Sequence, residues 1–114
     1  MTKERNSVLD SVLGQAKPLA GLIEYAADSV VSKTLLDKPV GTITLFAFDQ
    51  GQSLSEHTAP YHATVQVVDG KGMFTIGGRD NEVKAGEVLI MPANVPHALK
   101  AVKKFKMLLV MIKE

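Results

Sequence analysis

Residues 63–101 read ATVQVVDGKGMFTIGGRDNEVKAGEVLIMPANVPHALKA. Short segments rich in Val, Ile, Thr, Phe and Met alternate here with clusters of Gly, Asp, Pro and Asn, a pattern typical of an all-β domain. The turn-forming clusters fall at 69–72, 77–80, 85–86 and 92–94. The same alternation of apolar segments and turn residues extends from Val30 to Ile112. About nine strands with no helix between them cannot build a parallel sheet with crossover helices, so an antiparallel sandwich or barrel is predicted.

Alternation of residue types predicts which side chains point inward, because successive side chains of a strand lie on opposite faces. His97 shares its face with Val95, Leu99 and Ala101, and Lys100 lies on the other face. His97 is therefore predicted to point into the barrel. Around His57 the face is small and polar, so the pattern leaves the direction of His57 open.

The last segment, 105–112, is apolar on both faces from Met107 onward. A two-sided apolar strand must be covered twice, by the barrel interior and by a helix, a second sheet or a partner subunit. A short chain also gains burial by pairing with a second copy. We therefore expect a homodimer. The nearby lysines are expected on a solvated turn and strand face: Lys100, Lys103, Lys104 and Lys106.

Residues 1–29 are predicted to form a short helix and an extension, ahead of a β-barrel domain at 30–114. Ser7 and Asp10 nearly match a helix start signal, and apolar residues then repeat at helical spacing as far as Ala16. Pro18 is expected to end the helix. Its apolar stripe must lie on the outside of a sheet or on a partner chain.

Composition narrows the function classes. The 114 residues suit one domain, the net charge is +1, and the basic residues form no face with interleaved aromatics, so no nucleic-acid partner is expected. There is no cysteine, which excludes disulfides and thiolate metal sites. The apolar run 107–112 is too short to cross a bilayer, and no secretory signal is evident. We expect a cytoplasmic protein with no membrane partner.

Spaced glycines, histidines and a proline carry a resemblance to the cupin superfamily. The first motif of that family runs Gly, five residues, His, one residue, His, then a Glu and a final Gly, and the second runs Gly, five residues, Pro, one residue, Gly, two residues, His, three residues, Asn. This chain matches them at Gly51, His57 and Gly70, and at Gly86, Pro92, Asn94, His97 and Ala101. The resemblance implies a double-stranded β-helix, the jelly-roll-like cupin barrel, over about residues 40–112.

The departures from these motifs concern the metal ligands that the family commonly carries. Ala59 and Ala63 stand where the first motif has its second His and its Glu. Of the four ligand positions of the motifs, only two are therefore occupied by a residue that can bind a metal, His57 and His97. His62 lies one residue before the Glu position, beside a turn that leaves its direction uncertain. One hypothesis is a divalent metal (Fe, Mn, Zn or Ni) held by His57, His62 and His97. The other is a metal-free barrel in which His57 and His97 bind each other, water or a ligand.

These residues lead to three functional hypotheses. The preferred one is a barrel that binds a small polar metabolite around His57 and His97, in a cavity enlarged by Ala59 and Ala63. The alternatives are a metal-dependent dioxygenase or isomerase with three histidines, and a non-catalytic sensor or interaction module. No catalytic residue can be assigned, although paired imidazoles could act as acid and base. Four further side chains are candidates for the pocket mouth: Phe46, Phe48, Tyr61 and Met91.

Overall fold

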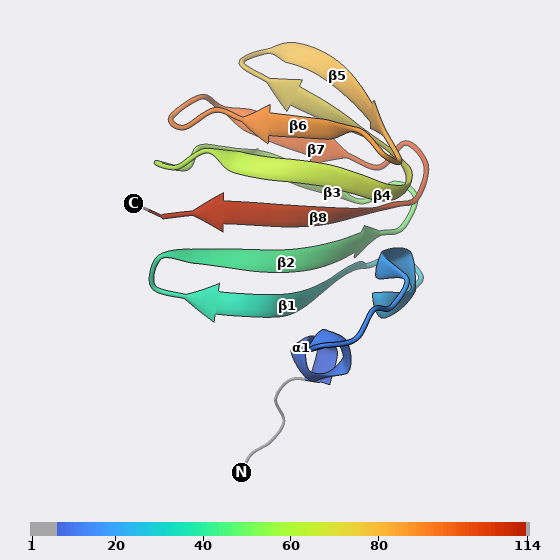
Figure 1. Ribbon diagram of the computed structural model, residues 1–114. Helices are drawn as coiled ribbons and strands as arrows, with labels where there is room; N and C mark the ends of the chain where they lie inside the picture. Colours follow the sequence, from blue (N-terminus) through green and yellow to red (C-terminus); the bar gives the residue numbers. More distant parts are fainter. Residues whose placement is uncertain (1–6, 114) are drawn as a thin grey trace.

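The computed structural model describes residues 7–113 and consists mainly of β-strands (Figure 1). Two short helices come first, the α-helix α1 (Ser7–Val12) and the 3-10 helix η1 (Leu19–Leu22). Eight strands follow: β1 (Val30–Lys38), β2 (Gly41–Phe48), β3 (Ser53–His57), β4 (Ala63–Ile76), β5 (Arg79–Lys84), β6 (Val88–Met91), β7 (His97–Lys100) and β8 (Phe105–Ile112). None of the described helices is long and apolar enough to cross a membrane.

The strands form a curled antiparallel arrangement of two sheets that share β4. The first sheet has the order β1, β2, β8, β4, β6, and the second has the order β5, β4, β7, β3. Every one of these pairs is antiparallel. The predicted all-β antiparallel barrel with a short N-terminal helix is confirmed.

Strand β4 is longer than the sequence predicted, because the expected break at 69–72 is a bend inside one strand of 14 residues. Gly70 has φ +71°, and a Cβ there would lie 2.3 Å from the Lys104 carbonyl oxygen. Only glycine permits this backbone and this approach. The bend lets β4 leave the first sheet and enter the second. The tight turn at Gly77-Gly78 is confirmed, with both glycines at positive φ.

Aromatic rings fill the space between the two sheets. The Phe48 and Phe105 rings stack at 4.8 Å between centroids, and Phe74 meets Phe105 edge to face at 5.9 Å. All three are fully buried. Gly72 lies against this cluster, where a Cβ would come within 2.7 Å of the Phe105 ring. Aromatic burial of this kind dominates the stability of a small core.

The N-terminal residues cover part of the outer face of the first sheet. Helix α1 ends at Val12, earlier than predicted, and Gly14 with φ +70° follows directly. Ile23, fully buried, packs with Leu45 and Ala47 of β2. Lys106 corrects a prediction, because it is 9% exposed rather than solvated. Its Nζ donates to the Ala20 carbonyl oxygen at 2.6 Å, and this contact ties η1 to β8.

Candidate functional site

Strand β7 carries His97 on the inner face of the second sheet, as the sequence predicted. His97 is 4% exposed, and Leu99 and Ala101, two and four residues further along, belong to the central core. The intervening Lys100 is exposed. The regular period of this short strand therefore fixes the direction of His97.

A β-bulge in β3 sets the direction of His57. Leu54 pairs with Leu99 and His57 pairs with His97, so three positions along β3 correspond to two along β7. The extra residue reverses the alternation, as bulges do. Leu54 packs against the core and His57 nevertheless meets His97 from the same side. Alternation alone left this direction open because it cannot show where a bulge falls.

The two imidazoles form a close pair at an edge of the second sheet. Their Nε2 atoms are 3.2 Å apart, and the rings meet at 73° with centroids 4.4 Å apart. The Nδ1 of His57 lies 2.8 Å from the Ser55 carbonyl oxygen, and the Nδ1 of His97 lies 3.2 Å from that of Val95. His57 is exposed, whereas His97 is buried. One ring thus faces solvent and the other faces the core.

The backbone contacts determine the tautomers of the pair. A carbonyl oxygen only accepts hydrogen bonds, so each Nδ1 must carry the proton and donate it. In a neutral imidazole the Nε2 is then an acceptor. Burial lowers the pKa of His97, and the nearby His57 lowers it further, which favours the neutral ring. If both rings are neutral, two lone pairs point toward one small region, which calls for a hydrogen-bond donor or a cation. If one ring is protonated, its Nε2–H donates to the Nε2 of the other.

His62 lies apart from this pair, on the outside of the first sheet. Its Nδ1 accepts a hydrogen bond from the Ala93 amide at 2.9 Å, and its neighbours include Thr64 and Val110. Within residues 7–113, no three His, Cys, Asp or Glu side chains group as metal ligands. The structure therefore does not group His62 with His57 and His97 as a third ligand, and the three-histidine metal site stays a prediction. The turn at Pro60-Tyr61 rotates His62 away.

One backbone–backbone and one backbone–side-chain hydrogen bond join the segment after His57 to the segment before His97. The Asn94 amide donates to the Ala59 carbonyl oxygen at 2.7 Å, alongside the bond between Ala93 and His62. Asn94 has φ +65°, a left-handed conformation that Asn tolerates better than most residues. It occupies the second Gly position of the second motif. An Asn at a position where the family motif has Gly indicates, from the sequence, a residue with a left-handed backbone.

The other candidate residues take different places. Phe48, Met91 and Ala63 are buried in the central core, and Phe46 packs against that core beside Phe48. Tyr61 lines a hollow on the outer face with His62. His57 and His97 line none of the hollows that Tyr61, Glu82, Val102 and Val110 help to form. The pair thus forms an open edge site, whose candidate ligand-binding atoms are the two Nε2 nitrogens.

The donor set can be compared with the needs of a metal. Catalytic zinc sites use three protein ligands, and their histidines donate the other ring N–H to a carbonyl or carboxylate. The Nδ1 contacts of both histidines meet the second condition. The first is unmet, because the described residues bring together two nitrogens and no third ligand. Two nitrogens alone do not make a catalytic metal site of this kind.

A two-sheet antiparallel barrel, with a histidine from each of the two neighbouring strands β3 and β7, defines a protein of the jelly-roll class. A family model described as a cupin domain matches residues 44–113. The chain belongs to the cupin family. No curated protein matches it.

Solved structures agree with this assignment. A conserved protein of unknown function from Streptococcus pyogenes is 34% identical, with a TM-score of 0.86 and 90% of each chain covered. A cupin superfamily protein from Desulfitobacterium hafniense is 28% identical, with a TM-score of 0.85, covering 90% of this chain and 94% of that one. A Cupin 2 conserved barrel domain protein from Leptotrichia buccalis is 43% identical, with a TM-score of 0.80, over 82% of this chain and 46% of that one.

Proposed function

We propose that this protein binds a small polar ligand at the His57–His97 pair and that the ligand supplies a hydrogen-bond donor. The observation that carries the proposal is the 3.2 Å separation of two Nε2 atoms whose rings both have Nδ1 on a backbone carbonyl. Two acceptors at this distance repel each other unless a donor or a cation lies between or beside them. A hydroxyl or ammonium group of a metabolite is such a donor.

The exposure of the two rings supports a ligand that arrives from solvent. His57 is exposed on β3, and its ring can be approached directly, whereas His97 is 4% exposed and is held against the core. A bound donor would thus contact one exposed and one buried acceptor. A buried acceptor without a partner costs free energy, so satisfying His97 would contribute to affinity.

A divalent metal is the second candidate, favoured by the same two nitrogens. Cis ligands about 2.1 Å from a zinc ion are themselves about 3.0–3.4 Å apart, which spans the observed separation. His57 and His97 would hold the ion, and the small molecule or water would complete its coordination. Bound there, it would supply a Lewis acid. The non-catalytic alternative is a barrel whose pair binds neither.

The tautomers provide the first test. In protein labelled with ¹⁵N in its histidine rings, long-range proton–nitrogen spectra at neutral pH should show a protonated Nδ1 and an acceptor Nε2 for His57 and His97. His62 should show the opposite tautomer, because its Nδ1 accepts from Ala93. A protonated Nε2 on either residue of the pair in the neutral protein would refute the proposal.

A thermal-shift screen provides the second test. Polyols, amino alcohols, amines and sugars are the first probes, and Zn²⁺, Mn²⁺, Fe²⁺ and Ni²⁺ are screened separately. A ligand raises Tm by mass action, so the shift should vanish in His57→Gln and persist in His62→Gln, the matched control. His57 is exposed, and its substitution should leave the fold intact. Shifts from the metals alone, together with stoichiometric metal in untagged protein, would favour the second candidate.

A further inference from the structure

Strand register extends the histidine pair into a row of four residues across the second sheet. His57 of β3 lies opposite His97 of β7, and His97 lies opposite Ile76 of β4. Ile76 in turn lies opposite Arg79, the first residue of β5. Directly paired residues point to the same face of a sheet. The side chain of Arg79 therefore leaves its strand on the face that carries His97.

The alternation along β5 gives the same direction for Arg79. Val83, four residues further along, is 4% exposed and belongs to the central core, and β5 pairs with β4 without a register shift. Residues at even spacing in a strand share a face, so Arg79 starts from the inner face as Val83 does. Asp80 lies on the outer face, where its Oδ1 accepts a hydrogen bond from Thr75 Oγ1 at 2.7 Å.

The turn between β4 and β5 is fastened to the segment that precedes His97. The Gly77 amide donates to the Pro96 carbonyl oxygen at 2.8 Å. This bond joins the backbone next to Arg79 to the backbone next to His97, so the positions of the two residues depend on each other. Their Cα atoms are two strand spacings apart, or about 10 Å. The long side chain of Arg79 can cover much of this distance.

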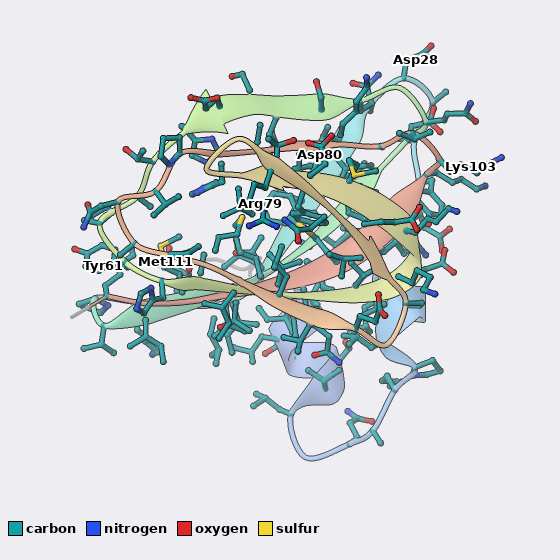
Figure 2. All side chains as sticks on the ribbon, turned by 90° about the horizontal axis from the view of Figure 1, so that it is seen from above. Asp28, Tyr61, Arg79, Asp80, Lys103 and Met111 are labelled. Carbon is teal, nitrogen blue, oxygen red and sulfur yellow. The ribbon has the colours of Figure 1, made fainter. Side chains whose placement is uncertain are left out.

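Arg79 is exposed, and within residues 7–113 it forms no ion pair with a carboxylate. Figure 2 shows Arg79 in the half of the barrel that contains Tyr61 and Met111. On the first sheet, the inner row at this end is apolar and consists of Met91, Ala63 and Met111. The N–H donors of the Arg79 guanidinium are thus available to an anion that arrives from solvent.

We propose that Arg79 binds a carboxylate of the same ligand whose hydroxyl or ammonium group binds at the His57–His97 pair. The inference rests on the proposed function and narrows its ligand to a small hydroxy acid or amino acid. A guanidinium presents two parallel N–H donors that match the two oxygens of a carboxylate. Ile76 lies between the two polar ends of the row and would contact the carbon atoms of the ligand.

Titrations followed by the ¹⁵N and ¹H shifts of the histidine rings test the proposal on the full chain. The probes are lactate, glycine, β-alanine and γ-aminobutyrate, each compared with the alcohol in which a CH₂OH group replaces the carboxylate. At least one acid should bind ~10-fold more tightly than its matched alcohol, because hydrogen bonds to charged groups contribute more than neutral ones. The acid that gains most reports the spacing between Arg79 and the pair.

Arg79→Gln should reduce the affinity for the acids to that for the alcohols and leave the alcohols unchanged. Lys84→Gln is the matched control, because Lys84 is exposed on the outer face of the same strand and the variant loses the same charge. This variant should bind like the wild type. Arg79 is exposed, so circular dichroism of Arg79→Gln should remain that of the wild type. His57→Gln should lose both sets of probes.

The outcomes separate the inference from the proposed function. Acids and alcohols that bind equally well to the wild type, and that are both lost in His57→Gln, would overturn the role of Arg79 and leave the pair as a binding site. A preference for acids that survives Arg79→Gln, or that falls as much in Lys84→Gln, would also overturn it. If neither set shifted the histidine resonances, the proposed function and the inference would both be wrong.

Discussion

The two ends of the outer face of the first sheet are built from the same strands and end up in different surroundings. At one end Ile23, Leu45 and Ala47 are fully buried beneath the N-terminal residues. At the other, Ile112 of β8 is 67% exposed. Both ends have apolar residues on this face. A strand that is apolar on both faces therefore predicts that its outer face is covered. Which part of that face is covered depends on the path of the covering segment.

The covered end is also fastened by polar contacts. Lys106 donates to the Ala20 carbonyl oxygen, and the Tyr25 hydroxyl donates to Asp69 Oδ2 at 2.5 Å. The Tyr25 ring also contacts Lys104 and Lys106, each with its Nζ 4.8 Å from the ring centroid. These groups join residues 18–25 to β4 and β8. The cover is thus part of the fold, and its removal should cost stability.

Ile23→Ala should have the largest effect of the changes considered for this face. Truncating a fully buried Ile to Ala removes apolar contacts and leaves a cavity, which costs about 2–5 kcal/mol. The free energy of unfolding, measured by urea denaturation, should fall by this amount with little change in slope. A loss below ~1 kcal/mol would mean that the covered end collapses around the gap, and the contrast between the two ends would weaken.

Lys106→Met should have an intermediate effect. Methionine keeps most of the buried stem but leaves the Ala20 carbonyl oxygen without its charged donor, which should cost about 1–2 kcal/mol. Urea denaturation again measures the change. Lys103→Met is the control, because Lys103 is exposed in the turn before β8 and should change stability by less than about 0.5 kcal/mol. If the Lys106→Met variant were more stable than the wild type, the free-energy cost of burying the Lys106 charge would exceed the stabilisation from its contacts.

Tyr25→Phe should have a smaller effect, of about 0.5–1 kcal/mol, because it removes only the hydrogen bond to Asp69 and keeps the contacts of the ring with the two lysines. Burial raises the pKa of Tyr25, and the bond to Asp69 raises it further. A raised pKa in the folded state stabilises below the unfolded value of about 10 and is lost as pH rises above it.

The difference in stability between wild type and Tyr25→Phe should therefore be constant near neutral pH and shrink above about pH 10. Urea midpoints of both proteins across this range measure it. A difference that grows with pH would contradict the assigned contact. Tyr25→Leu removes the ring as well, and any additional loss reports the contribution of Lys104 and Lys106.

Much of the fold could be predicted because local chemistry and tertiary structure agree. Regular alternation and Gly-rich turns gave the antiparallel barrel, the hairpin at Gly77-Gly78 and the inward direction of His97. The prediction that a strand ends at 69–72 was wrong, because glycine occurs in turns between strands and also at bends inside a strand. Gly70 and Gly72 allow a bend and a close approach to Lys104 and Phe105, and both lie inside β4.

The site was predicted less completely because its geometry depends on strands far apart in the sequence. The bulge before His57 arises from pairing with β7, about forty residues later, and leaves no local mark. The Nδ1 of His62 accepts a hydrogen bond from the Ala93 amide, which the spacing of the histidines in the sequence could not predict. Lys106 was expected to be solvated because it was grouped with Lys100, Lys103 and Lys104. Its burial follows from the path of residues 18–25, which brings the Ala20 carbonyl oxygen to its Nζ.

Ile112→Ala should have the smallest effect on the single chain. The side chain is 67% exposed, so truncation should cost less than about 0.5 kcal/mol when the protein is dilute. At high concentration the result should differ if the homodimer expected from the sequence forms through this face, because association makes Tm depend on protein concentration. Wild-type Tm should rise with concentration, and Tm of Ile112→Ala should rise less. If Ile112→Ala lowered the free energy of unfolding as much as Ile23→Ala at every concentration, the end that contains Ile112 would be covered within one chain. The two ends of the outer face would then not differ.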